Sequence, residues 1–131
     1  MAVTINTSLQ NQQADAWGTD LNSGFIDIYT GAQPAANAAP SGTLLVSCAL
    51  AADAFAAAAA GVAAKNGSII GTATNNGTAG YAQMRNAANT RWMYGSVTAT
   101  GGGGDVELDT ITIAVDDVVT ITTCVITQPA S

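Results

Sequence analysis

The sequence contains no histidine, a single glutamate and three basic side chains, and each scarcity removes a class of function. Without histidine there is no imidazole to act as a general base or a metal ligand, so a Ser-His-Asp triad is excluded. The three basic residues are Lys65, Arg85 and Arg91. They are outnumbered by nine acidic residues, so the net charge is −6. Because nucleic-acid binding requires a basic surface, we expect no nucleic-acid partner.

A long apolar segment is also missing. The most apolar stretch, residues 44–64, is rich in alanine and contains Asp53 and Gly61, so it predicts no membrane span. The first five residues, MAVTI, have neither the basic nor the apolar region of a secretion signal. We therefore expect no membrane partner.

Small residues take the place of the charged ones. Alanine, threonine and glycine number 27, 17 and 14, whereas 9% of the 131 residues are charged, against about 25% in an average globular chain. A surface of small, weakly polar residues is often one that packs against another protein. The length is typical of one domain, which we place at residues 1–131.

The apolar pattern predicts a short N-terminal helix. After an arm at residues 1–6, residues 7–21 are assigned to the helix, because Thr7 and Gln10 have the spacing of a capping box. Gly24 is suited to a left-handed cap at its end. The apolar face is weak, so we expect the helix to lie on a surface or against a partner.

Residues 24–128 have the pattern of a β domain. Residues 25–29 alternate, with Ile26 and Ile28 on one face. Further strands are predicted at 43–50, 68–73, 80–85, 91–98, 106–108, 110–115 and 118–127, with a long loop at 30–42. Seven or eight short strands separated by turns predict a mainly β fold, an antiparallel β-sandwich or jelly-roll-like domain. The alanine-rich stretch 51–64 is compatible with a helical turn or with extended chain.

Three features could carry chemistry, and each has a simpler interpretation. The glycine run 101–104 lacks the lysine of a phosphate-binding loop and predicts a mobile hairpin tip. Asp105, Glu107 and Asp109 alternate and could bind calcium, although a solvated strand face is the simpler interpretation. Cys48 and Cys124 are expected to be buried free thiols, with a disulfide between two sheets as the alternative.

The aromatic residues and the long loop are the best candidates for a contact surface. In the strand at 91–98, Trp92 and Tyr94 share one face. The candidate interface residues are Leu9, Trp17, Tyr29, Gln33, Pro34, Trp92 and Tyr94. No catalytic group, metal site or cofactor motif stands out, so we expect a non-enzymatic protein without a cofactor.

The order of several segments resembles that of a family of small virion structural proteins of tailed phages and prophages. The resemblance rests mainly on Tyr29–Ala35 (YTGAQPA) followed by Gly42–Leu45 (GTLL). The shorter segments Ala52–Phe55, Gly77–Tyr81 and Trp92–Val97 follow in the same order, and the similarity extends over the chain after Thr7.

The resemblance implies a capsid decoration (cement) protein that binds and stabilises the assembled capsid lattice. Its partners would be the major capsid protein and copies of itself, with a homotrimer as the expected form. It would be located on the capsid surface of a virion assembled in the host cytoplasm. Two alternatives are a neck, collar or tail-attached virion protein, and a surface carbohydrate-binding module that presents Tyr29, Tyr81 or Trp92.

Overall fold

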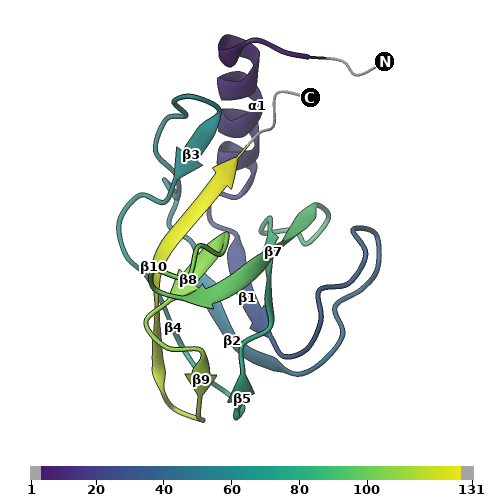
Figure 1. The fold of residues 1–131 in the computed structure, drawn as a ribbon, viewed down its shortest axis with the longest axis vertical. Helices are drawn as coiled ribbons and strands as arrows, with labels where there is room; N and C mark the ends of the chain where they lie inside the picture. Colours follow the sequence, from purple (N-terminus) through teal and green to yellow (C-terminus); the bar gives the residue numbers. More distant parts are fainter. Residues whose placement is uncertain (1–3, 128–131) are drawn as a thin grey trace.

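The computed structural model describes residues 4–127, and it confirms a mainly β fold with one short N-terminal helix (Figure 1). Residues 1–3 of the predicted arm and residue 128 of the predicted β domain lie outside the described residues. The elements are α1 (Thr7–Asp20), β1 (Phe25–Tyr29), β2 (Leu44–Ala49), β3 (Val62–Ala64), β4 (Ile69–Thr72), β5 (Gly77–Thr78), β6 (Tyr81–Arg85), β7 (Trp92–Ala99), β8 (Val106–Leu108), β9 (Thr112–Ile113) and β10 (Val118–Thr127). Two of these strands, β3 and β5, were not predicted.

Eight of the strands form one curled sheet in the order β2-β1-β6-β7-β8-β10-β3, with β4 also paired to β10. β5 and β9 form a separate pair. The curl brings β4 against β2, where a Cβ on Gly71 would lie 2.7 Å from the Val46 side chain. The resulting shape is that of a β-sandwich-like domain. The prediction of a purely antiparallel sheet is wrong in one place, because β7 and β8 pair in parallel.

The glycine run lies between these two parallel strands and not at a hairpin tip, so that prediction is wrong. Parallel neighbours usually need a crossover of a dozen residues or more, but here Val97 pairs with Val106. The connection between the two strands can be this short because Gly102 packs against β7. A Cβ on Gly102 would lie 2.7 Å from Cβ of Thr98, too close for any other residue.

The ends of α1 differ from the expected caps. Asn6, and not Thr7, is the N-cap, and its Oδ1 accepts a hydrogen bond from Leu9 N at 3.0 Å. Ser23 adopts the left-handed conformation that was expected of Gly24. Gly24 is needed for a different reason, because a Cβ there would lie 2.3 Å from the carbonyl oxygen of Arg85.

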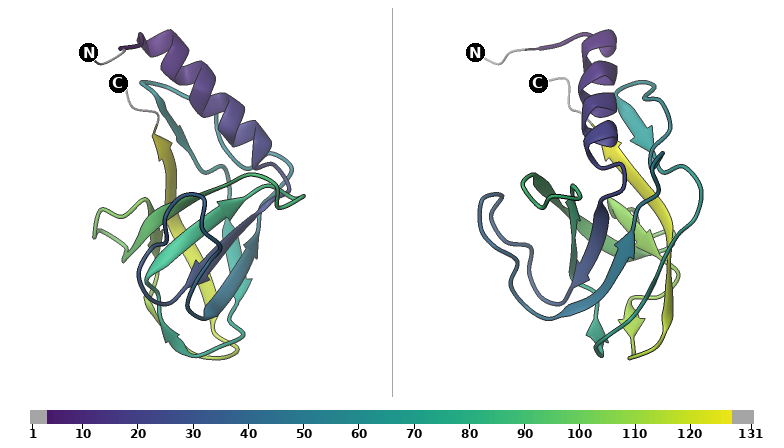
Figure 2. Two further views of the ribbon diagram at one scale, coloured as in Figure 1. Left: turned by 90° about the vertical axis from the view of Figure 1, so that its right-hand side faces the viewer. Right: turned by 180° about the vertical axis from the view of Figure 1, so that it is seen from behind.

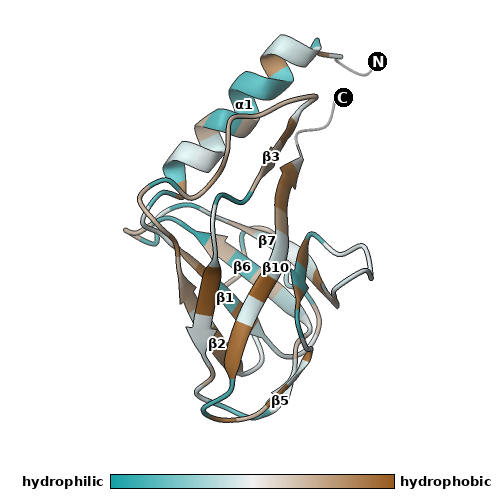
Figure 3. Cartoon of the chain, turned by 90° about the vertical axis from the view of Figure 1, so that its left-hand side faces the viewer, coloured by the Kyte–Doolittle hydropathy of each residue, from teal (hydrophilic) through white to brown (hydrophobic). Residues whose placement is uncertain are grey.

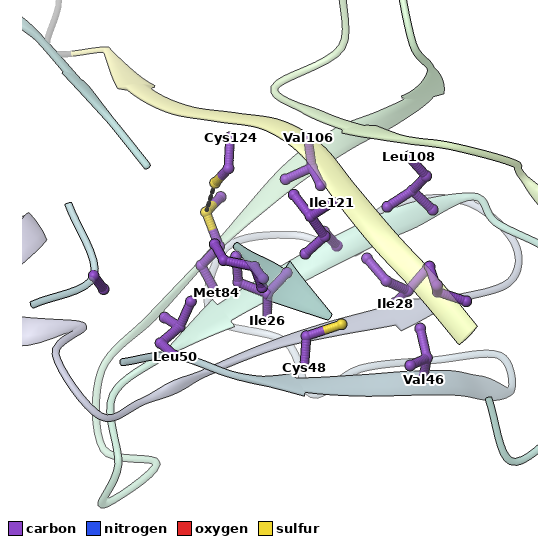
Figure 4. Packing of buried hydrophobic residues seen from close by; sticks show 14 of the residues in the cluster. Ile26, Ile28, Val46, Cys48, Leu50, Met84, Val106, Leu108, Ile121 and Cys124 are labelled. Carbon is purple, nitrogen blue, oxygen red and sulfur yellow. Dashed lines mark hydrogen bonds between the residues drawn. The ribbon is translucent and has the colours of Figure 1, made fainter. Parts of the chain in front are cut away.

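The core lies inside the curl of the sheet (Figure 4). The alternation predicted for residues 25–29 is confirmed, since Ile26 and Ile28 are both fully buried. They pack with inward-facing side chains from the other strands, among them Val46, Cys48, Met84, Val106, Leu108, Ile121 and Cys124. Burial of these apolar groups is the main source of stability for the fold.

The alanine-rich segment at residues 51–61 is irregular, with turns at 52–53 and 60–61, and not helical. Isolated bridges join Phe55 to Lys65 and Ala59 to Val62. The segment lies beside α1, as both views in Figure 2 show, and Gly18 of the helix approaches Phe55. The helix thus packs on its own chain, with Ala14 and Gly18 as its buried residues.

Candidate functional site

The loop between β1 and β2 is held against one face of the sheet by three aromatic side chains. Trp92 Nε1 donates a hydrogen bond to the carbonyl oxygen of Ala36 at 3.0 Å. The Tyr94 hydroxyl donates to that of Ala38 at 2.7 Å. The Tyr81 hydroxyl donates to the Ser41 carbonyl at 2.5 Å and accepts from Ser41 N at 2.9 Å. The loop therefore has a defined conformation.

Strand alternation explains why these side chains lie together. The register pairs Tyr29 with Tyr81 and Gln83 with Tyr94, so that all of them lie on the face opposite the core. The Tyr29 and Tyr81 rings stack with their centroids 5.3 Å apart. The Tyr94 ring meets Tyr81 edge-on at 5.6 Å. Such ring pairs add about 0.5–1.5 kcal/mol each beyond the area that they bury.

Between this loop and the sheet lies a groove of about 480 Å³. Its lining comes from four strands and two loops: Asp27, Tyr29, Ala39, Pro40, Leu44, Gln83, Arg85, Asn89 and Trp92. The volume falls within the range of about 300–1,000 Å³ that is common for ligand pockets. We call this set of residues the loop groove.

A partly buried ion pair forms part of the loop groove. Asp27 Oδ2 accepts a hydrogen bond from Arg85 Nε at 2.8 Å, and Asp27 Oδ1 accepts one from the Ser47 hydroxyl at 2.5 Å. The Arg85 guanidinium lies 4.3 Å from the centre of the Phe25 ring. These contacts fix the orientation of the guanidinium and balance its charge.

Tyr29, which lines the loop groove, and Tyr94, beneath the loop, keep their phenol protons at neutral pH. Burial raises the pKa of Tyr29, and the negative charge of Asp27 raises it further. Burial likewise raises the pKa of Tyr94. Both phenols therefore stay protonated near pH 7, as the bond from Tyr94 to Ala38 requires.

Of the seven predicted interface residues, four pack against this loop, two belong to it, and one lies apart. Trp17 and Trp92 border a second pocket of about 300 Å³ together with Ala36 and Asn37 of the loop. The Trp17 indole nitrogen also contacts Met93 Sδ. Tyr29, Trp92 and Tyr94 lie at the loop groove or beneath the loop, and Gln33 and Pro34 lie within the loop itself. Leu9 is 40% exposed on α1, about 12 Å along the helix from Trp17.

Sequence reasoning missed the polar residues of the loop groove. Asp27, Gln83 and Arg85 alternate with buried apolar residues in β1 and β6. A signal was present, because a polar residue at every second position of a predicted strand marks its second face. The pattern does not reveal that a distant loop folds over that face.

The acidic alternation in and beside β8 is used for internal hydrogen bonds. Asp105 Oδ2 accepts from Ser96 N at 3.0 Å, and Asp109 Oδ1 accepts from Thr110 N. Glu107 Oε2 accepts from Gly103 N at 2.8 Å, and this bond holds the pKa of the carboxyl below its usual value. Within residues 4–127 no group of three or more acidic or cysteine side chains is placed to hold a metal ion.

The prediction of buried free thiols is confirmed. Cys48 and Cys124 are both buried and unpaired, and Cys124 Sγ lies 3.8 Å from Met84 Sδ. Burial raises the pKa of each thiol to about 12. Because the thiolate is the reactive form, both cysteines are unreactive in the folded protein.

No protein-family model, no curated protein and no solved structure matches the chain. Among the helices of the described residues, none is long and apolar enough to cross a membrane.

Proposed function

We propose that this chain is a non-enzymatic structural protein of a tailed-phage virion, a decoration protein that binds the assembled capsid lattice. Two findings support the proposal, the resemblance in the YTGAQPA and GTLL segments and an exposed apolar face on β4 and β10. The exposed apolar face is the structural observation on which the proposal depends. The partners would be the major capsid protein and further copies of this chain, arranged as a homotrimer on the capsid surface.

The apolar face consists of the outward side chains of Ile70, Thr72, Val118 and Thr120. Thr120 lies opposite Ile70 and Val118 opposite Thr72 in the β4–β10 pair, so Ile70 and Val118 are diagonal neighbours within side-chain reach. Ile70 is 51% exposed and Val118 61%. Neither strand contains a charged residue, and β10 is coloured mainly brown and white where it faces the viewer in Figure 3.

Such a face suits contact with another protein. Large β-branched side chains on an uncharged strand pair gain free energy when a partner removes them from water. A strand face offers a rigid surface, which lowers the entropy lost on binding.

Lattice binding would stabilise a capsid through mass action. A protein that binds the assembled lattice and not free subunits shifts the equilibrium towards assembly. Many identical sites and an oligomeric binder add avidity, so a modest affinity per contact is sufficient. The chain needs no catalytic group for this role.

Copy number in purified particles tests the proposal directly. Quantitative mass spectrometry against the major capsid protein should give one copy per capsid subunit or a simple fraction of it. About a dozen copies or fewer would overturn the decoration role and favour a neck, collar or tail-attached protein. Absence from the particle would overturn both virion roles.

A charge placed in the apolar face tests the contact itself. Val118→Lys should abolish binding to particles that lack the protein, because a buried, unpaired ammonium opposes docking. Ala87→Lys, in the exposed turn between β6 and β7, introduces the same charge away from β4 and β10 and should bind normally. Equal binding of the two variants would rule out this face as the contact.

A further inference from the structure

We infer that the loop groove binds a neutral saccharide. This inference goes beyond the proposed function and does not depend on it, because it concerns the isolated chain. It rests on two side chains with unused hydrogen-bonding groups, on a balanced charge and on aromatic walls.

Gln83 is the first observation. The residue is 4% exposed, and the hydrogen bonds of residues 4–127 include none from its side-chain amide. Yet no fully buried side-chain nitrogen or oxygen lacks a partner in that part of the chain. The amide of Gln83 must therefore reach the loop groove, which it lines. A nearly buried amide without a protein partner is costly unless a ligand or water satisfies it.

Arg85 is the second observation. Asp27 accepts its Nε–H at 2.8 Å, and Phe25 lies against the guanidinium. Its two terminal NH₂ groups make no hydrogen bond to the described residues. They are donors whose direction is already fixed, so binding a hydroxyl costs little side-chain entropy.

The charge of the site favours a neutral ligand. Arg85 is paired with Asp27, so the two charges in the loop groove cancel, and the whole chain carries a net charge of −6. An anionic ligand would find no excess positive charge. A polyol needs both donors and acceptors, and Arg85, Gln83 and Asn89 supply them.

Aromatic rings complete the site. Tyr29 and Trp92 line the loop groove, and their ring systems can pack against the C–H faces of a sugar while the hydroxyls bond to the polar groups. An extended peptide is a poorer fit. β1 pairs with β2 and β6, and β6 with β1 and β7, so neither β1 nor β6 offers a free edge to peptide main chain.

The loop groove and the apolar face lie on opposite sides of the molecule. In Figure 1 the loop between β1 and β2 extends to the right, whereas β4 and β10 lie on the left, and Figure 2 agrees. A chain that used the apolar face to dock would keep the loop groove open to solvent. The two surfaces can therefore be tested independently.

The test is a titration of the isolated protein with maltose, lactose and cellobiose, followed by NMR. At millimolar concentrations at least one disaccharide should shift the side-chain amide signals of Gln83 and the indole signal of Trp92. Gln83→Leu should weaken binding by about tenfold or more. Gln12→Leu, the same change on the exposed face of α1, should leave the affinity unaltered.

A second variant keeps the test valid if Gln83→Leu does not fold. Asn89→Gly removes an amide from the loop groove while keeping the left-handed backbone of residue 89, and it should also weaken binding. Absence of shifts with all three disaccharides would overturn the inference. So would stronger binding of sodium acetate than of any disaccharide, since the loop groove would then be an anion site.

Discussion

Two alanine-rich segments of this protein lack regular secondary structure, and they are held in opposite ways. Residues 31–43 offer mainly carbonyl oxygens, which accept hydrogen bonds from Trp92, Tyr94 and Tyr81, and one amide, that of Ser41, which donates to Tyr81. Residues 51–61 offer amides, which donate to side-chain oxygens. Ala58 N donates to Asp15 at 2.6 Å, and Gly61 N donates to Asn11 at 2.8 Å.

The difference explains the composition of the elements that hold each segment. Aromatic donors bury ring area as well as forming hydrogen bonds, so β6 and β7 stabilise the first segment by packing and polarity together. Helix α1 uses short polar acceptors, and it buries little apolar surface. Its weak apolar face is thus accounted for by hydrogen bonds to its own chain, and it does not require a second protein.

The largest expected effect comes from Tyr81, which is fully buried. Tyr81→Ala should lower the free energy of unfolding by about 3–5 kcal/mol, since it removes a buried ring. Tyr81→Phe keeps the ring but leaves the N–H and C=O of Ser41 without their partner, at about 1–2 kcal/mol. Urea unfolding measures both values, and equal losses would mean that the hydroxyl and not the ring holds the loop.

The second segment should respond to loss of its acceptors. Asp15→Ala and Asn11→Ala should each cost about 1 kcal/mol and speed hydrogen exchange at the amides of Ala58 and Gly61 respectively. Thr19→Ala is the matched control, since it makes a similar change in helix propensity at a side chain for which no hydrogen bond within residues 4–127 is found. Unchanged exchange at Ala58 and Gly61 would contradict this account of how α1 docks.

A smaller effect is expected at the tip of the first segment. Trp92→Phe removes the bond to Ala36 but keeps an aromatic ring, and the Tyr94 and Tyr81 bonds remain. The stability should fall by less than about 1 kcal/mol, while NMR order parameters should fall at residues 35–38. Tyr94→Phe should show its largest effect at Ala38 instead. Identical profiles for the two variants would show that the bonds do not act locally.

The smallest expected effect concerns the glycine run at residues 101–104. Glu107 holds this run by accepting a hydrogen bond from Gly103 N. Because this bond lowers the folded pKa of Glu107, its stabilisation is present at neutral pH and is lost as the pH falls through that lowered value. The NMR shift of the Gly103 amide should therefore titrate with a midpoint below the ordinary glutamate pKa of about 4.3. Glu107→Gln should remove this titration, and a midpoint at or above the ordinary value would contradict the bond.

Much of the local structure could be read from the sequence. The strands predicted at 25–29, 80–85 and 91–98 are found within one residue of those bounds, and the buried thiols follow from their place in apolar strands. The helix was found, although its cap was misplaced by one residue because Asn6 and Thr7 are both good capping residues. The conformation of residues 51–61 could not be predicted, because alanine favours a helix and the groups that bind this segment lie in α1.

Which side chains share a face of each strand follows from the sequence alone, because alternation is a property of neighbouring residues. Three other features depend on the fold as a whole: β7 and β8 pair in parallel, the loop at 31–43 folds over Trp92 and Tyr94, and Asp27 pairs with Arg85. These contacts join residues that are far apart in the chain, or they require an unusually short connection between two strands. Their free energy depends on the packing of the whole sheet, and no local pattern records it.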